Sequence, residues 1–311
     1  MSAIRSPGGP RKNEKESETV HLESHQAVGG TLYVVATPIG NLGDITLRAL
    51  DMLRGVDIVA AEDTRDSGRL LHHYGIAAKL VALHEHNERS AGAKIIERLQ
   101  EGQSVALISD AGTPAISDPG AHLVAAVRAA GHKVTPLPGA NAAVCALSAA
   151  GLADAHFLFY GFLPHGAGER RRRLEALKTL PYLLVFYESP HRILDCVADL
   201  RTVLGDARRI TFARELTKLF ESIHACALGE AQAWLEGDAN RQKGEFVLLV
   251  SGAEIQKEAG VGAAAQRTLA LLLAELPLKQ AVKLAAEISG EKKNALYELA
   301  LALKEGERDE G

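Results

Sequence analysis

The sequence predicts an α/β protein, because strand-like and helix-like segments alternate along most of its 311 residues. Apolar runs rich in Val, Ile and Leu stop abruptly at turn-forming residues, and helical patterns follow them. Such alternation is typical of parallel sheets covered by helices. Two junctions between a strand and its loop, residues 31–44 and 105–120, are rich in small and turn-forming residues. Because open α/β sheets bind ligands beyond the carboxyl ends of their strands, these loops predict a small-molecule site. Neither loop has the glycine spacing of a nucleotide phosphate site.

Composition and charge exclude several classes of protein. Hydrophobic residues make up 47% of the chain, and the formal net charge is −4, which argues against coating nucleic acid through bulk charge. A nucleic-acid partner would therefore have to meet a local basic patch. The isolated Cys145, Cys196 and Cys226 form no C-x-x-C pair, so they indicate neither a zinc ribbon nor a disulfide framework. With no apolar run that spans a bilayer and no secretory signal, we expect a cytoplasmic protein without a membrane partner.

The first domain is expected over residues 29–140, after an extension over residues 1–28 that we expect to be disordered. The extension has almost no apolar residues to offset the entropy cost of ordering. Asp44 is expected to cap a helix that presents Leu47, Leu50 and Leu53 as apolar positions. The expected strands are residues 32–36, 56–61, 79–83, 105–109 and 133–137. About five repeats of strand and helix predict a mostly parallel sheet.

The second domain is expected over residues 141–252. Its later strands follow one another closely, so the sheet is expected to include antiparallel pairs. Ser189 is expected to cap a helix with Pro190 in its first turn. The expected strands are residues 157–162, 182–187, 209–213, 222–228 and 245–250, and the expected helices are 169–180, 190–204 and 230–236.

The last residues, 263–311, predict a helical domain after a polar linker at residues 253–262. Helical patterns at residues 269–275, 278–288 and 292–303 are separated by tight breaks. Three short helices of this kind resemble a helix-turn-helix unit, and the alternative is a small helical cap on the core. The pattern alone favours the cap.

Polar residues at three strand ends are candidates for chemistry. Glu62, Asp63 and Arg65 follow one strand; they could open a helix, but their place at the sheet edge favours function. Residues 84–87, His-Glu-His-Asn, could ligate a metal, yet no third ligand stands at a familiar spacing, so we expect no metal and a polar contact with substrate. The small residues from Asp110 to Asp118 would let backbone amides approach a ligand closely.

Two further segments carry concentrated charge. Residues 170–173 are four consecutive arginines, the densest positive patch in the chain. Such a run usually marks a solvated helix face, and phosphate contact is the functional alternative. In the segment Tyr187–Arg192, helix capping accounts for Ser189 and Pro190 but not for Glu188 or Arg192.

Taken together, these motifs resemble one family. The sequence from Gly30 to Gly252 is similar to the ribosomal RNA small subunit methyltransferase I family, within the tetrapyrrole methylase superfamily, and the terminal helices resemble its helix-turn-helix tail. The motifs are ATPIGNLGDIT at 36–46, AEDTR at 61–65, HEHN at 84–87, SDAGTPAISDPG at 109–120, PGAN at 138–141 and YESPHR at 187–192.

The resemblance implies two αβα domains with S-adenosylmethionine in the cleft between them, a homodimer, and 2′-O-methylation of a cytidine in the 16S rRNA of the small ribosomal subunit. The cofactor contacts that it implies are Pro38, Ile39, Asp110, Thr113, Asn141 and Ala142. Where the wider superfamily has Gly-Asp-Pro, this chain has Ser-Asp-Ala at residues 109–111.

A base for the ribose hydroxyl is open among Glu62, Asp63, His86 and Glu188, and no metal is required. The candidate RNA contacts are Arg65, Arg170, Arg171, Arg172, Arg173, Lys279, Lys283, Lys292 and Lys293. Two other functions are weighed against this one. They are methylation of a tetrapyrrole carbon, which the helical tail and the arginine run disfavour, and a non-catalytic nucleic-acid-binding regulator that senses the cofactor.

Overall fold

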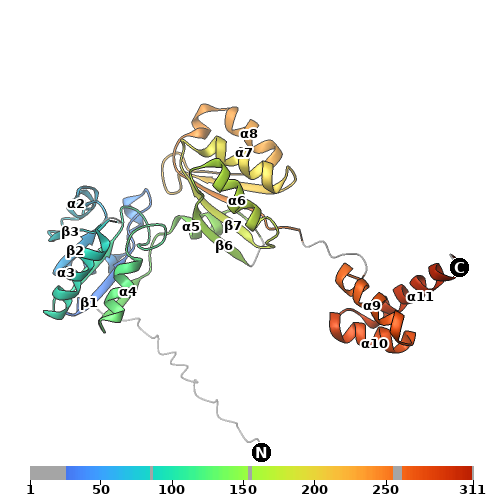
Figure 1. Ribbon diagram of the computed structural model, residues 1–311. Coiled ribbons are helices and arrows are strands. Elements are labelled where there is room, and N and C mark those ends of the chain that lie inside the picture. Colours follow the sequence, from blue (N-terminus) through green and yellow to red (C-terminus); the bar gives the residue numbers. More distant parts are fainter. Residues whose placement is uncertain (1–25, 85–86, 153–155, 255–260, 310–311) are drawn as a thin grey trace, which may run out of the picture. The chain divides into compact units, whose positions relative to one another are not determined.

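The described part of the chain forms two five-stranded sheets, each covered by helices, and a further group of three helices (Figure 1). The computed structural model describes residues 26–84, 87–152, 156–254 and 261–309. Contacts divide the chain into two compact units between Gly252 and Ala253, and both sheets belong to the first. The domain boundary expected near residue 140 therefore remains a prediction. Residues 1–25, most of the extension expected to be disordered, lie outside the described residues.

The first sheet is entirely parallel, as the alternation predicts. Its strands lie in the order β3-β2-β4-β1-β5. They are β1 (Thr31–Val35), β2 (Ile58–Ala61), β3 (Leu80–Ala82), β4 (Val105–Ile108) and β5 (Lys133–Leu137). Every residue of β2 and β4 is buried, because helices cover both faces of the sheet.

Helices α1 (Leu47–Gly55) and α2 (Thr64–His73) cover one face, and α3 (Glu88–Gln100) and α4 (Ala121–Ala129) cover the other. The expected start of α1 is corrected. Asp44 ends a short 3₁₀ helix, η1 (Leu42–Asp44), and the Thr46 hydroxyl caps α1 by accepting a bond from the Ala49 N–H. Leu47 is exposed, because the buried face of α1 consists of Ala49, Leu50, Met52 and Leu53.

The strand order creates a switch point at the centre of the sheet. Strands β1 and β4 are neighbours, but β1 leads toward β2 on one side while β4 leads toward β5 on the other. Their helices, α1 and α4, cover opposite faces. The two loops therefore diverge and leave a crevice at the carboxyl edge of the sheet, where ligands of such folds bind.

The second sheet is mixed, as the close spacing of its later strands predicts. Its order is β6-β7-β10-β8-β9, with β6 and β7 parallel and the other pairs antiparallel. The strands are β6 (Phe157–Phe162), β7 (Leu183–Glu188), β8 (Arg209–Arg214), β9 (Ser222–Ala227) and β10 (Phe246–Val250).

Helix α5 (Ala142–Ala149) packs on one face of this sheet, and α6 (Ala167–Leu177), α7 (Ile193–Leu204) and α8 (Leu228–Glu236) pack on the other. A short 3₁₀ helix, η2 (Ala239–Gln242), follows α8. Helix α7 begins later than expected, with Arg192 as its first flanking residue. Ser189 and Pro190 instead form the turn between β7 and α7.

The second unit consists of α9 (Ala263–Glu275), α10 (Leu278–Ser289) and α11 (Lys293–Asp309). These helices bury an apolar core of their own, which includes Leu269, Val282 and Leu296. The break between α9 and α10 ends at Pro277, whose ring fixes the backbone angle φ just before α10 begins. Within the described ranges, no helix is both long and apolar enough to cross a membrane.

Candidate active site

Three loops at the carboxyl edge of the first sheet are bonded to one another. Thr37 and Gly112 exchange backbone hydrogen bonds of 2.9 and 3.1 Å, which joins the loops after β1 and β4. The Thr113 hydroxyl donates to the Ala140 carbonyl at 3.0 Å and adds the loop after β5. Gly112 has a φ of +84°, and a Cβ there would lie 3.3 Å from Ile39 Cγ2. This close approach, which favours glycine, makes the loops one continuous wall.

A cavity of about 330 Å³ lies between this wall and the second sheet. The first half of the chain contributes Ile39, Ala111, Gly112, Thr113, Ile116, Ser117 and Asp118, and α5 contributes Ala142 with its cap Asn141. The second sheet and its loops contribute Phe162, Tyr187, Glu188, Ser189, Pro190, Ala213, Leu216, Glu245, Phe246 and Val247. The lining of the cavity is mostly apolar, with a few polar groups, as small-molecule sites commonly are.

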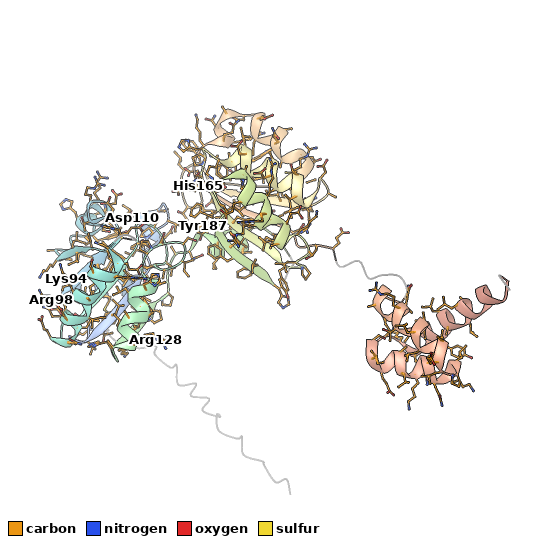
Figure 2. The ribbon with its side chains drawn as sticks, viewed as in Figure 1. Lys94, Arg98, Asp110, Arg128, His165 and Tyr187 are labelled. Carbon is orange, nitrogen blue, oxygen red and sulfur yellow. The ribbon has the colours of Figure 1, made fainter. Side chains whose placement is uncertain are left out.

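Four residues expected to contact a cofactor line this cavity: Ile39, Thr113, Asn141 and Ala142. Asn141 also caps α5, because its side-chain oxygen accepts a bond from the Val144 N–H. Pro38 and Asp110 are not among the lining residues. Asp110 lies at the edge of the first sheet (Figure 2), where its Oδ1 accepts a bond of 3.0 Å from the Asp63 N–H.

Two of the acids considered as bases have structural partners. Asp63 caps α2, and its carboxylate lies 2.6 Å from Arg65 Nη2, so the pKa of Asp63 is far below its usual range. The Glu188 carboxylate is fully buried, accepts a bond from the Ser189 N–H and lies 3.3 Å from Arg192. These contacts hold both carboxylates in place.

Glu62 is half-buried at the end of β2, and burial followed by the charge of Asp110 raises its pKa. It is not one of the cavity-lining residues. His86, the remaining candidate, lies outside the described residues together with Glu85. The described residues contain no group of three or more His, Cys, Asp or Glu side chains placed to hold a metal ion.

Sequence reasoning missed Asp118 as a site residue, although it lies within the loop that was singled out. Asp118 lines the cavity, and burial raises its pKa to about 6. The charges of Glu62 and Asp110 act in the same direction, while a hydrogen bond from Ser109 opposes them. A carboxyl group with this pKa can exchange protons near neutrality.

Two aromatic residues of the cavity were also missed. Phe162 and Tyr187 lie edge to face with ring centroids 5.6 Å apart. A β-bulge at Phe159–Gly161 precedes Phe162, and bulges redirect the side chains that follow them. Phe162 lines the cavity and is half-exposed. The aromatic residues of β6 and the YESPHR segment were the available signals.

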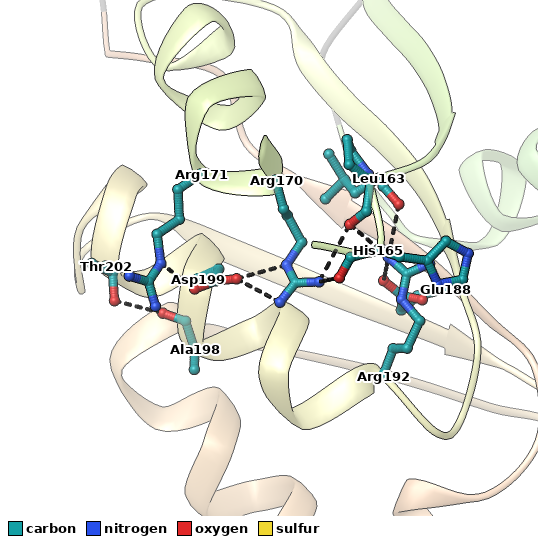
Figure 3. A network of polar contacts seen from close by, with 10 residues as sticks. Leu163, His165, Arg170, Arg171, Glu188, Arg192, Ala198, Asp199 and Thr202 are labelled. Atoms are coloured by element: carbon teal, nitrogen blue, oxygen red, sulfur yellow. Dashed lines mark hydrogen bonds and ion pairs between the residues drawn. The ribbon is translucent and has the colours of Figure 1, made fainter. Parts of the chain in front are cut away.

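The four arginines of α6 differ in their surroundings, and two of them, Arg170 and Arg171, both bond Asp199 (Figure 3). Arg170 is buried and bonds the Asp199 carboxylate, which removes Arg170 from the predicted RNA contacts because no RNA could reach it. Arg171 is half-exposed but bonds the same carboxylate at 2.5 Å. Arg172 and Arg173 are exposed and lie 3.2 and 3.7 Å from Glu169. In the second unit, the lysines predicted to contact RNA are all exposed: Lys279, Lys283, Lys292 and Lys293.

Comparison with family models agrees with this architecture. Residues 31–232 match the model of the Tetrapyrrole (Corrin/Porphyrin) Methylases. Residues 259–304 match the model of the RsmI C-terminal HTH domain. The second unit therefore has the helix-turn-helix character that the resemblance implied, and the interpretation as a plain helical cap is wrong.

Curated relatives match nearly the whole chain. A ribosomal RNA small subunit methyltransferase I from Escherichia coli is 55% identical, covering 90% of this chain and 99% of the relative. One from Pseudomonas aeruginosa is 57% identical, covering 88% of this chain and 97% of the relative. Solved structures are more distant and establish only the fold. The methyltransferase CobJ is 22% identical with a TM-score of 0.55, over 75% of this chain and 97% of its own. Diphthine synthase is 15% identical with a TM-score of 0.55, over 71% of this chain and 90% of its own.

Proposed function

Because the chain belongs to the ribosomal RNA small subunit methyltransferase I family of tetrapyrrole methylases, we propose that it methylates the ribose 2′-hydroxyl of a cytidine in 16S rRNA, with S-adenosylmethionine as donor. The chain is a methyltransferase by family, so a methyl donor is required. The observation that carries the proposal is the joined wall of three loops facing a cavity between the two sheets.

The residues present fit this donor. When bound, S-adenosylmethionine supplies a methyl group on a positively charged sulfur. Burial is the main cause that raises the pKa of Glu62 and of Asp118, and the charge of Asp110 adds to it at both. Carboxylates at this end of the sheet attract a cation. Ile39, Thr113, Asn141 and Ala142 would hold the donor, because they line the cavity and carry both apolar and polar groups. The positive backbone φ angles of Gly112, Ala115 and Ser117 shape the loop around that space.

The protein contributes alignment and the exclusion of water. A 2′-hydroxyl is a weak nucleophile, so the cavity must hold its oxygen in line with the methyl carbon and the sulfur. The apolar wall formed by Ile39, Leu216 and Val247 would exclude water from that line. Removal of the hydroxyl proton by a positioned base would contribute about a hundred- to ten-thousand-fold in rate.

An RNA substrate is supported by the second unit. The family model of that unit is a helix-turn-helix domain, and the names of the curated relatives specify the small-subunit ribosomal RNA. Exposed Lys292 and Lys293 at the start of α11 could contact phosphates. Methylation of a tetrapyrrole carbon would leave this unit without a role, and a regulator without catalysis would leave the methyltransferase relatives unexplained. We also propose that the protein is cytoplasmic and that it forms a homodimer. Light scattering can test the homodimer.

The test is a transfer experiment with methyl-labelled donor. Small ribosomal subunits, free 16S rRNA and a tetrapyrrole precursor are each incubated with the full chain. We expect label in the RNA, recovered after nuclease digestion as 2′-O-methylcytidine. Label on a base, on another ribose or on the tetrapyrrole would contradict the proposal. Binding of the donor without transfer to any of the three would favour the regulator.

A further inference from the structure

Three carboxylate residues line the cavity among the described residues: Asp118, Glu188 and Glu245. Glu188 is held by Arg192 and by the Ser189 N–H. The Glu245 carboxylate is largely exposed and lies 2.8 Å from Lys218 Nζ. No salt bridge joins Asp118 to a cation of the described chain. Asp118 is therefore the cavity carboxylate whose oxygens are not committed to a positive partner.

The chain holds Asp118 on a constrained backbone. Ser117 before it has a φ of +65°, which costs free energy in a residue with a side chain. Pro119 after it has a ring that fixes φ, and its carbonyl accepts a bond from the Ala115 N–H. The next N–H, of Gly120, donates to the buried Glu88 carboxylate at 2.9 Å. These restraints on both sides position the Asp118 side chain against the cavity.

The neighbours of Asp118 indicate which chemistry the position serves. Tyr187 lies close enough that the Asp118 charge adds to the burial that raises the Tyr187 pKa. Tyr187 contacts Phe162, a half-exposed residue that also lines the cavity. Ser117 approaches the bulged strand β6, since a Cβ on Gly161 would lie 2.8 Å from Ser117 Oγ. Asp118, Tyr187 and Phe162 therefore line one cavity, and a substrate bound there would meet all three.

Three titratable groups interact with Asp118, and they come from three elements. Glu62 follows β2, Asp110 follows β4 and Tyr187 lies on β7. Two of them are acids, so they disfavour a second negative charge and make Asp118 more basic. The Ser109 side chain acts in the opposite direction, because it lowers the pKa of Asp118.

We propose that the Asp118 carboxylate is the catalytic base that accepts the proton of the attacking ribose hydroxyl. This inference rests on the proposed function. The hydroxyl oxygen forms a bond to the methyl carbon, the bond from that carbon to sulfur breaks, and its electron pair stays on sulfur, which becomes a neutral thioether. The hydroxyl proton moves to an Asp118 oxygen and then to solvent, so charge and atoms balance.

The test compares wild type, Asp118→Asn and the control Asp51→Asn, whose exposed carboxylate lies on α1. Methylation of small subunits is followed from pH 5 to 9. In wild type we expect kcat to rise with pH through a midpoint near 6. Asp118→Asn should lower kcat about a hundred- to ten-thousand-fold and abolish that midpoint, with KM for subunits changed less than about twofold. Asp51→Asn should match wild type.

Two readouts without turnover complete the test. Calorimetry with S-adenosylhomocysteine should give equal affinity for wild type and Asp118→Asn. Carbon NMR of carboxyl-labelled aspartate should show one resonance titrating near pH 6 that is absent in Asp118→Asn. If Asp118→Asn fails to fold, Asp118→Glu replaces it and should retain a pH midpoint with reduced kcat.

The outcomes separate the two proposals. An inactive wild type refutes the proposed function. An active wild type with an equally active Asp118→Asn, or one that keeps the same midpoint, refutes Asp118 as the base. Loss of S-adenosylhomocysteine affinity in Asp118→Asn would make Asp118 a binding residue and also overturn the inference.

Discussion

Arg170 and Asp199 form a buried ion pair between α6 and α7, in which Arg170 Nη2 lies 2.6 Å from Asp199 Oδ2 and both side chains are almost inaccessible. Arg170 also donates to the His165 carbonyl at 3.0 Å, so the pair fixes the segment between β6 and α6 (Figure 3). The most prominent charge run of the sequence thus has one member that packs two helices together.

Arg170→Ala should destabilise the protein by about 3–5 kcal/mol, because it leaves the Asp199 carboxylate buried without its main partner. Urea unfolding measures the loss. Arg172→Ala on the same helix is the control, and it should change stability by less than about 0.5 kcal/mol, since its pair with Glu169 is exposed. Similar effects of the two substitutions would contradict the packing role of Arg170.

Glu88→Gln should lower both stability and activity. The buried Glu88 carboxylate accepts bonds from Gly120 and Leu123 N–H groups at the start of α4, so it offsets the positive end of that helix. We expect a loss of about 1–2 kcal/mol and a reduced kcat, because the Asp118 loop loses an anchor. Unfolding and methylation assays measure these. Glu97→Gln, exposed on α3, should be neutral, and full activity in Glu88→Gln would show that the anchor is dispensable.

Lys292→Ala with Lys293→Ala should weaken binding to small ribosomal subunits and flatten its salt dependence, because each lost phosphate contact removes counterion release. The matched double variant is Arg172→Ala with Arg173→Ala. Both guanidinium groups lie near the Glu169 carboxylate, so they should contribute less to RNA binding. Filter binding at several salt concentrations measures both. A larger effect of the arginine pair would place the main RNA contact on α6.

Asp118→Asn should become more stable relative to wild type as pH rises from 4 to 7.5. The pKa of Asp118 is about 6 in the folded protein against an ordinary value of 3.8, so the folded state binds more protons in this window. Stability from this group is fully present below the ordinary pKa and is lost as pH rises through the folded pKa. Because Asp118 is only partly buried, the gain should be about 1 kcal/mol. Thermal unfolding at several pH values measures it, and a gain independent of pH would contradict the assignment.

Much of the architecture follows from local patterns. Apolar runs that end at turn residues predict the strands of the first sheet, and the short spacing after residue 205 predicts antiparallel pairs. Strand order does not follow, because it depends on packing between distant segments. The start of α1 was wrong because Asp44 and Thr46 are both good capping residues, and only the fold decides which is used.

The site was predicted in part for a similar reason. The loop containing Asp110 and Asp118 is evident from its composition, but both acids follow the same strand. Of these two acids only Asp118 lines the cavity. The lining depends on how distant segments pack together, and no local pattern contains that information. Likewise, four consecutive arginines point in all directions around a helix. Which one is buried depends on Asp199, 29 positions further along the chain.

The four residues with side chains and positive φ in the described chain all lie in two loops beside the cavity: Ala115 and Ser117 in one, Glu215 and Thr217 in the other. Each holds free energy that tighter packing elsewhere must offset. Substitutions that relieve these strained angles should raise the thermal stability of the protein. Such gains would alter the walls that shape the site, so stabilising substitutions should be sought within the helices α6, α7 and α8 or in the second unit, where no residue with a side chain has a positive φ among the described residues.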